Sequence, residues 1–134
     1  MPLNVLIVDD SSVTRAMIIK TLKMTGLPLG EIHQAGNGWE GLGLLEGNEI
    51  DLAIVDINMP VMNGEEMIAT LRANPKWESL PVLVVSTEGS QTRIEQFHRY
   101  GAKFVHKPFS PEAVFKTIED LTGQKYAQPC DTDF

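Results

Sequence analysis

Residues 52–64 read L-A-I-V-D-I-N-M-P-V-M-N-G, and this stretch decides how the rest of the chain is interpreted. Its first four residues are all apolar, which is typical of a strand buried on both faces of a parallel sheet. The apolar run ends at Asp56. Placing an acidic side chain directly after a buried strand costs desolvation free energy, so it is expected where the carboxylate has a function. The stretch therefore predicts a parallel strand with a functional carboxylate at its carboxyl end.

Similar apolar runs lie on both sides of this stretch, and helical patterns separate them. Gly26 and Gly101 are expected to end helices, and Ser110 followed by Pro111 is a strong helix start. The predicted strands are residues 3–8, 31–35, 52–55, 82–85 and 103–105; the predicted helices lie near residues 13–25, 39–45, 65–72, 92–100 and after Ser110. This alternation indicates an α/β fold with helices on both faces of an open parallel sheet, because a closed barrel needs about 200 residues or more.

The length and charge of the chain limit its function. Its 134 residues suit one domain, expected at residues 1–122, and residues 123–134 are expected to form a short mobile tail. The net charge of −7 argues against nucleic acid and anionic membranes as direct partners. Cys130 is the only cysteine, so no disulfide can form within the chain, which fits a cytoplasmic location. No apolar run is long enough to span a membrane.

Polar side chains stand where the predicted strands end. Asp9 and Asp10 follow the first strand, Asp56 the third, Ser86 the fourth and Lys107 the fifth. The carboxyl ends of parallel strands meet at one edge of a sheet, where open α/β folds place their sites. Three carboxylates so close repel each other, and Mg²⁺ relieves that repulsion while accepting a phosphate oxygen. Lys107 and Ser86 could both contact a phosphoryl group, so the pattern predicts a Mg²⁺-dependent phosphoryl site.

These motifs together resemble the receiver domain of two-component response regulators, most closely the single-domain CheY type. The resemblance rests on V-L-I-V-D-D-S at residues 5–11, on residues 52–64, on P-V-L-V-V-S-T-E at residues 81–88 and on K-P-F at residues 107–109. It extends over residues 3–121. It implies a flavodoxin-like fold, with five parallel strands in the order 2-1-3-4-5 and helices on both faces.

The resemblance also implies roles for the matching residues. Asp56 matches the phosphoacceptor, which takes a phosphoryl group from a sensor histidine kinase or a phosphotransfer protein. Asp9, Asp10 and Asp56 would hold Mg²⁺ together with the backbone carbonyl of Asn58. Lys107 would contact the phosphoryl oxygens. Such a chain is not an ordinary enzyme, but it assists its own phosphorylation and dephosphorylation.

A switch and an output surface follow from the same resemblance. Ser86 would bind the phosphoryl group, and Phe104 would turn inward into the space that Ser86 leaves. Asn58 and Glu88 match the positions that set the rate of hydrolysis. The protein-binding face would be the fourth helix, fifth strand and fifth helix, with Gln91, Ile94, Phe104 and Phe109.

About a dozen residues follow the last helix, which is too few for a DNA-binding output domain, so the output is expected to be contact with another protein. The chain is expected to be a monomer or weak dimer. The target would be the flagellar motor switch in chemotaxis, or another protein in a phosphorelay. Three residues depart from motor-switch regulators. Phe104 stands where they carry tyrosine, Gln91 where they carry a basic residue, and Thr87 where alanine is common. These departures weaken only the motor-switch assignment.

Other interpretations compete with this one. Residues 36–41 read G-N-G-W-E-G, the pattern of a dinucleotide-binding loop, so the chain could be a small nucleotide- or flavin-binding enzyme using Gly36 to Gly41. The loop follows the second strand instead of the first, however, and Asn37-Gly38 could simply form a turn. A phosphorylation-independent scaffold is a further alternative. Asp9-Asp10 could merely cap the first helix, and Trp39 and Trp77 are expected to be packing residues.

Overall fold

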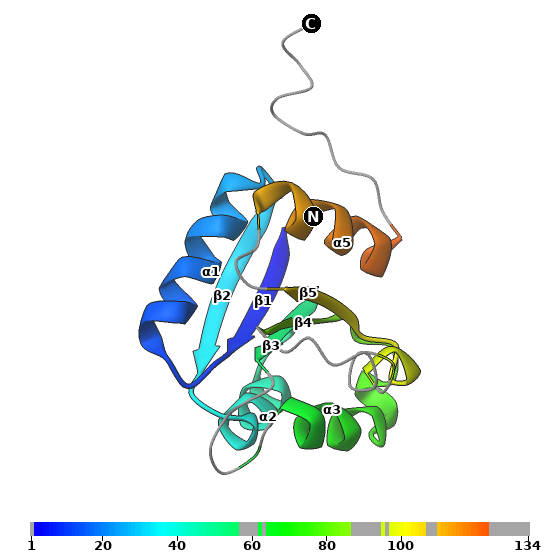
Figure 1. Ribbon diagram of the computed structural model, residues 1–134. Helices are drawn as coiled ribbons and strands as arrows, with labels where there is room; N and C mark the ends of the chain where they lie inside the picture. Colours follow the sequence, from blue (N-terminus) through cyan, green and yellow to red (C-terminus); the bar gives the residue numbers. More distant parts are fainter. Residues whose placement is uncertain are drawn as a thin grey trace, which may run out of the picture.

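The computed structural model describes residues 2–56, 62, 64–86, 95, 97–106 and 110–123. Five parallel strands form one sheet in the order β2-β1-β3-β4-β5 (Figure 1), as predicted. The elements in chain order are β1 (Leu3–Val8), α1 (Ser12–Met24), β2 (Leu29–Ala35), α2 (Gly38–Gly47), β3 (Leu52–Asp56), α3 (Gly64–Arg72), the short 3-10 helix η1 (Pro75–Trp77), β4 (Val82–Ser86), β5 (Lys103–His106) and α5 (Pro111–Thr122). Helices α1 and α5 cover one face of the sheet, and α2 and α3 cover the other (Figure 1).

The predicted element boundaries are confirmed with small differences. Strand β2 begins at Leu29, two residues before the predicted start. The Ser110 hydroxyl accepts a hydrogen bond from the Ala113 N–H at 3.1 Å, which confirms the predicted start of α5. Gly26 and Gly101 have φ angles of 77° and 76°, the left-handed conformation expected of glycines that end helices. Of the predicted fourth helix, residues 95 and 97–100 are described; residues 95 and 97–99 are helical, and Tyr100 lies in the turn that follows.

Two apolar layers explain the continuous apolar strands. In β1, Val5 and Ile7 pack in the layer with α1 and α5, while Leu6 and Val8 pack in the layer with α2 and α3. Each of these side chains is at most 1% exposed. Full burial of one such side chain contributes about 1.5–3 kcal/mol, so each of these four residues stabilises one layer or the other. Among the helices that the structure describes, none has both the length and the apolar character that a membrane crossing requires.

The register of the central strand positions the predicted site. Strand β3 lies between β1 and β4, with Val55 opposite Val8 and Asp56 opposite Val85. Asp9 directly follows Val8, and Asp56 directly follows Val55, the strand partner of Val8. The sheet itself thus places these two acidic residues side by side.

The start of α2 is packed closely against the segment before α3. The Gly38 N–H donates to the Met62 carbonyl at 3.0 Å. A Cβ atom at Gly38 would lie 2.9 Å from that carbonyl oxygen and 3.0 Å from the Cβ of Met67. At Gly43, in the same helix, a Cβ would meet nothing within 4 Å. The two glycines therefore serve different purposes, and only Gly38 is required by packing.

We expect the two alanine substitutions to change stability in opposite directions. Gly38→Ala should lower the free energy of unfolding by about 1–3 kcal/mol, because backbone and core atoms would have to move. Gly43→Ala should raise it by about 0.5–1 kcal/mol, because alanine has less conformational freedom to lose in a helix. Urea denaturation followed by circular dichroism measures both. A Gly38→Ala variant as stable as the wild type would contradict this account of the packing.

Candidate metal centre

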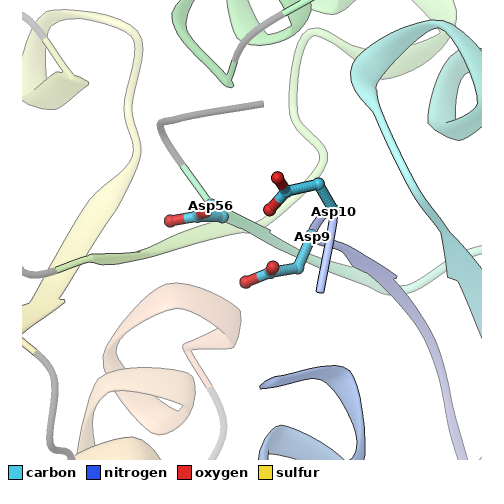
Figure 2. A group of neighbouring side chains, drawn as sticks. All are labelled: Asp9, Asp10 and Asp56. Atoms are coloured by element: carbon cyan, nitrogen blue, oxygen red, sulfur yellow. The ribbon is translucent and has the colours of Figure 1, made fainter. Parts of the chain in front are cut away.

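Three carboxylates meet at the carboxyl ends of β1 and β3. Asp9, Asp10 and Asp56 each provide an oxygen, and these oxygens lie within 4.8 Å of one another (Figure 2). Asp9 is 1% exposed and Asp56 is 7% exposed, whereas Asp10 is open to solvent. The predicted cluster is therefore present, with two members buried and one accessible.

The chemistry of this cluster fits a hard divalent cation. Two carboxylates about 4–5 Å apart repel one another by about 3–4 kcal/mol at the effective dielectric of a protein surface. A cation among them replaces that repulsion with attraction. Oxygen ligands alone, few in number and partly open to water, suit Mg²⁺ better than zinc, which prefers histidine and cysteine. Asp9, Asp10 and Asp56 would hold such an ion.

Hydrogen bonds on both sides fix the position of Asp9. Its Oδ1 accepts from the Ser11 N–H at 2.9 Å, and its own N–H donates to the Ala35 carbonyl at 3.0 Å. Its carbonyl accepts from Nη1 of Arg15 at 2.5 Å, and Nε of Arg15 donates to Oε1 of Gln34 at 3.0 Å. Arg15 thus ties the start of α1 to the ends of β1 and β2. The sequence analysis missed Arg15, because no spacing or motif marks a side chain that binds a backbone carbonyl.

The interpretation of Asp9 and Asp10 as helix caps is wrong. The N-cap of α1 is Ser11, whose hydroxyl accepts from the Thr14 N–H at 3.2 Å. The first turn of α1 contains no acidic residue. The two carboxylates are therefore placed at the strand end, beside Asp56, and not on the helix.

The structure places two other predicted residues near this edge. Ser86 is the last residue of β4 and directly follows Val85, the strand partner of Asp56. Phe104 lies in β5 opposite Val84, is partly buried and packs against the apolar layer under α2 and α3. The remaining predicted residues lie outside the described part of the chain: Lys107, Asn58, Glu88, Thr87, Gln91, Ile94 and Phe109.

The glycine-rich loop at residues 36–41 is a helix cap. Oδ1 of Asn37 accepts from the Glu40 N–H at 2.9 Å, and Oε1 of Glu40 accepts from the Gly36 N–H at 3.1 Å. The Gly38 N–H is bonded to the Met62 carbonyl. A dinucleotide-binding loop offers such N–H groups to phosphate, but here the protein itself uses them. The loop therefore gives no support to a nucleotide- or flavin-binding enzyme.

Comparisons with known proteins agree with this fold and this cluster. Residues 5–119 match the family model described as the response regulator receiver domain. A chemotaxis protein CheY homolog of Campylobacter jejuni is 37% identical over 123 residues, which is 90% of this chain and 93% of that protein. The solved structure of the chemotaxis response regulator CheY4 of Vibrio cholerae is 34% identical, with a TM-score of 0.78 over 90% of this chain and 99% of that one.

A larger protein contains a similar segment. The sensor histidine kinase CheAY of Helicobacter pylori is 39% identical over 118 residues, covering 86% of this chain but only 14% of the kinase. The chain belongs to the response regulator receiver domain family, and it is a receiver of two-component signal transduction. This membership confirms the family that the strand-end motifs indicated.

Removing one carboxylate should reduce the stability that the protein gains from Mg²⁺, but raise its stability when no cation is present. We expect Mg²⁺ at about ten times its dissociation constant to raise the free energy of unfolding of the wild type by about 1.4 kcal/mol. Asp56→Asn and Asp9→Asn should lose most of this gain. In EDTA, Asp56→Asn should be more stable than the wild type, because one of the repelling charges is gone.

Thermal unfolding with Mg²⁺ or EDTA measures these effects, and titration calorimetry gives the affinity. The control is Glu78→Gln, which removes an exposed carboxylate outside the cluster and should respond to Mg²⁺ like the wild type. An equal response to Mg²⁺ in Asp56→Asn and the wild type would disprove the metal centre.

Proposed function

We propose that Asp56 accepts a phosphoryl group from a histidine kinase or a phosphotransfer protein, in a Mg²⁺-dependent reaction that controls binding to a target protein. The observation that carries this proposal is the cluster of three carboxylate oxygens within 4.8 Å of one another. Asp56 is its only member on the central strand, so groups from both neighbouring strands can act on a phosphoryl group held there.

The positions of the three carboxylates favour Asp56 as the nucleophile. Asp9 is less exposed than Asp56, at 1% against 7%, and its Oδ1 is already bonded to the Ser11 N–H. Asp10 is exposed and lies in the loop that follows β1, outside the strand itself. An oxygen of Asp56 would attack phosphorus and form an acyl phosphate, while the phosphorus–nitrogen bond to the donor histidine breaks and the ring, already protonated on its other nitrogen, leaves as neutral imidazole. Mg²⁺, when bound, would neutralise part of the negative charge on the phosphoryl group during transfer.

Family resemblance supports roles for further residues. Ser86 and Lys107 would bind the phosphoryl oxygens, and the carbonyl of Asn58 would complete the metal ligands. Asn58 and Glu88 would set how fast water removes the group. Phe104, which packs partly buried in β5, would report the change by turning toward the space near Ser86. The altered face would include Gln91, Ile94, Phe104 and Phe109.

The pathway and the domain limits are also part of the proposal. The Campylobacter, Vibrio and Helicobacter relatives that match most of this chain are chemotaxis proteins, which supports a chemotaxis-type role. The similar segment in the kinase CheAY supports a histidine kinase as the phosphoryl donor. Residues 1–122 would form the receiver and residues 123–134 a tail. The chain would act in the cytoplasm, as a monomer or weak dimer, on the motor switch or another protein.

Intact mass spectrometry after incubation with acetyl phosphate tests the chemistry. With Mg²⁺, the wild type and the control Glu78→Gln should gain the mass of one phosphoryl group. EDTA should abolish the gain, because the repulsion among the carboxylates and the incoming anion is then uncompensated. Asp56→Ala should show no gain under any condition.

Rapid sampling keeps hydrolysis from hiding the adduct. An adduct on Asp56→Ala as abundant as on the wild type would overturn Asp56 as acceptor. A wild type that never gains mass, although it folds and binds Mg²⁺, would favour the phosphorylation-independent scaffold.

A further inference from the structure

A groove lies between α2 and the segment formed by α3 and η1, and none of its lining residues belongs to the carboxylate cluster. Its volume is about 520 Å³, within the range of ligand-binding clefts. One wall is a single face of α2, since its residues are spaced by three and four. The residues that matter for its chemistry are Trp39, Leu42, Gly43, Glu46, Asn74 and Trp77.

Two indole side chains flank this groove, and they differ in burial. Trp77 is partly buried against the apolar layer under α2 and α3, and its backbone is held firmly: its N–H donates to the Asn74 carbonyl at 2.9 Å, and its carbonyl accepts from Nη1 of Arg72 at 2.8 Å. Trp39 is 68% exposed, so the expectation that it is a packing residue is wrong. Tryptophan is enriched at protein interfaces, and here one tryptophan lies exposed beside a cleft with a second in its wall.

Gly43 keeps the wall of α2 open between the two ends of the groove. Nothing lies within 4 Å of the place where its Cβ would stand. Packing therefore does not require glycine at this position, although glycine is among the least favourable residues inside a helix. The missing side chain leaves room between Trp39 and Glu46.

The segment of chain that contains the groove residues is strongly acidic. Residues 37–80 contain eight acidic and two basic residues, a net charge of −6 out of −7 for the whole chain. Of the two basic residues, Arg72 donates to the carbonyls of Tyr100 and Trp77, and Lys76 lies in η1. Glu46 is exposed at the groove. A cation held there would gain both from this carboxylate and from the faces of the indole rings.

We infer that the groove binds a segment of a partner protein that carries arginine or lysine next to apolar residues. The cationic group would lie between Glu46 and Trp39, and the apolar side chains would lie against Leu42 and Trp77. A second copy of this chain is a poorer occupant. It could offer the exposed apolar and basic side chains of α1, but α1 lies on the opposite face of the sheet from the groove, so two copies would not make this contact reciprocally in a closed dimer. This binding goes beyond the proposed phosphorylation and does not require it.

Two variants alter the groove without removing core atoms, and a third is their control. Gly43→Leu fills the groove, and Glu46→Lys reverses its charge. Gly47→Leu makes the same glycine-to-leucine change in the same helix, also where a Cβ meets nothing within 4 Å, but outside the groove. All three should fold, since leucine and lysine favour helices, and thermal unfolding confirms this. Asp56→Asn is added to separate this test from the proposed phosphorylation.

The experiment is selection of random linear peptides displayed on phage against the wild-type chain, with depletion on Gly43→Leu. Enriched peptides should contain arginine or lysine beside an apolar residue. In fluorescence titrations their dissociation constants should rise about tenfold or more in Gly43→Leu and Glu46→Lys, and by less than about twofold in Gly47→Leu and Asp56→Asn. Added salt should weaken binding.

Three results would overturn the inference. The first is no enrichment over the depleted background, and the second is enriched peptides that lack a basic residue or bind Gly43→Leu as well as the wild type. The third comes from light scattering: a wild type that self-associates beside a monomeric Gly43→Leu would show that the occupant is a second copy.

Discussion

Repulsion among three carboxylates at one edge of a parallel sheet is the constraint on which the rest of this structure depends. Parallel strands bring their carboxyl ends together, and the register places Asp56 next to the end of β1. Asp9 and Asp56 are almost fully buried there, so water screens the repulsion between their carboxylates only weakly. Such a site is costly when empty and favourable when a cation, and then a phosphoryl group, is present.

The protein holds this unfavourable arrangement with ordinary structure around it. The two apolar layers fix β1 and β3, and the sheet register leaves no freedom in the relative position of Asp9 and Asp56. Arg15 ties the carbonyl of Asp9 to Gln34, and these hydrogen bonds hold the loop before α1 in place against the repulsion. Binding of a small ion or group at this edge therefore changes the local charge at a fixed position in the fold.

Much of the fold could be predicted because both faces of each central strand are buried. Continuous apolar runs marked β1, β3 and β4 closely. The start of the edge strand β2 was harder to predict from the sequence. Its first residues are not fully buried, and Leu29 pairs with Leu3 of β1 just before an irregularity in the register. The carboxylate cluster followed from topology alone, since the strand ends of a parallel sheet converge.

Features that depend on distant side chains could not be predicted in the same way. Arg15 acts on a backbone carbonyl, which leaves no pattern in the sequence. The groove between Trp39 and Trp77 joins residues far apart in the chain, and only the packing of α2 beside α3 shows that one indole stays exposed. The glycine-rich pattern at residues 36–41 was ambiguous for a related reason, because the same sequence pattern occurs in phosphate-binding loops and in helix caps. The hydrogen bonds of Asn37 and Glu40 show that it is a helix cap here.

The central claim is that the phosphoryl group goes to the carboxylate of the central strand and to no other acidic residue. Reduction of the phosphorylated chain with borohydride converts an aspartyl phosphate to homoserine, and peptide sequencing by mass spectrometry then locates it. The account predicts homoserine at position 56 alone, and only when Mg²⁺ was present during phosphorylation. Homoserine at position 9 or 10, or a phosphoryl group on a residue outside the cluster, would contradict it.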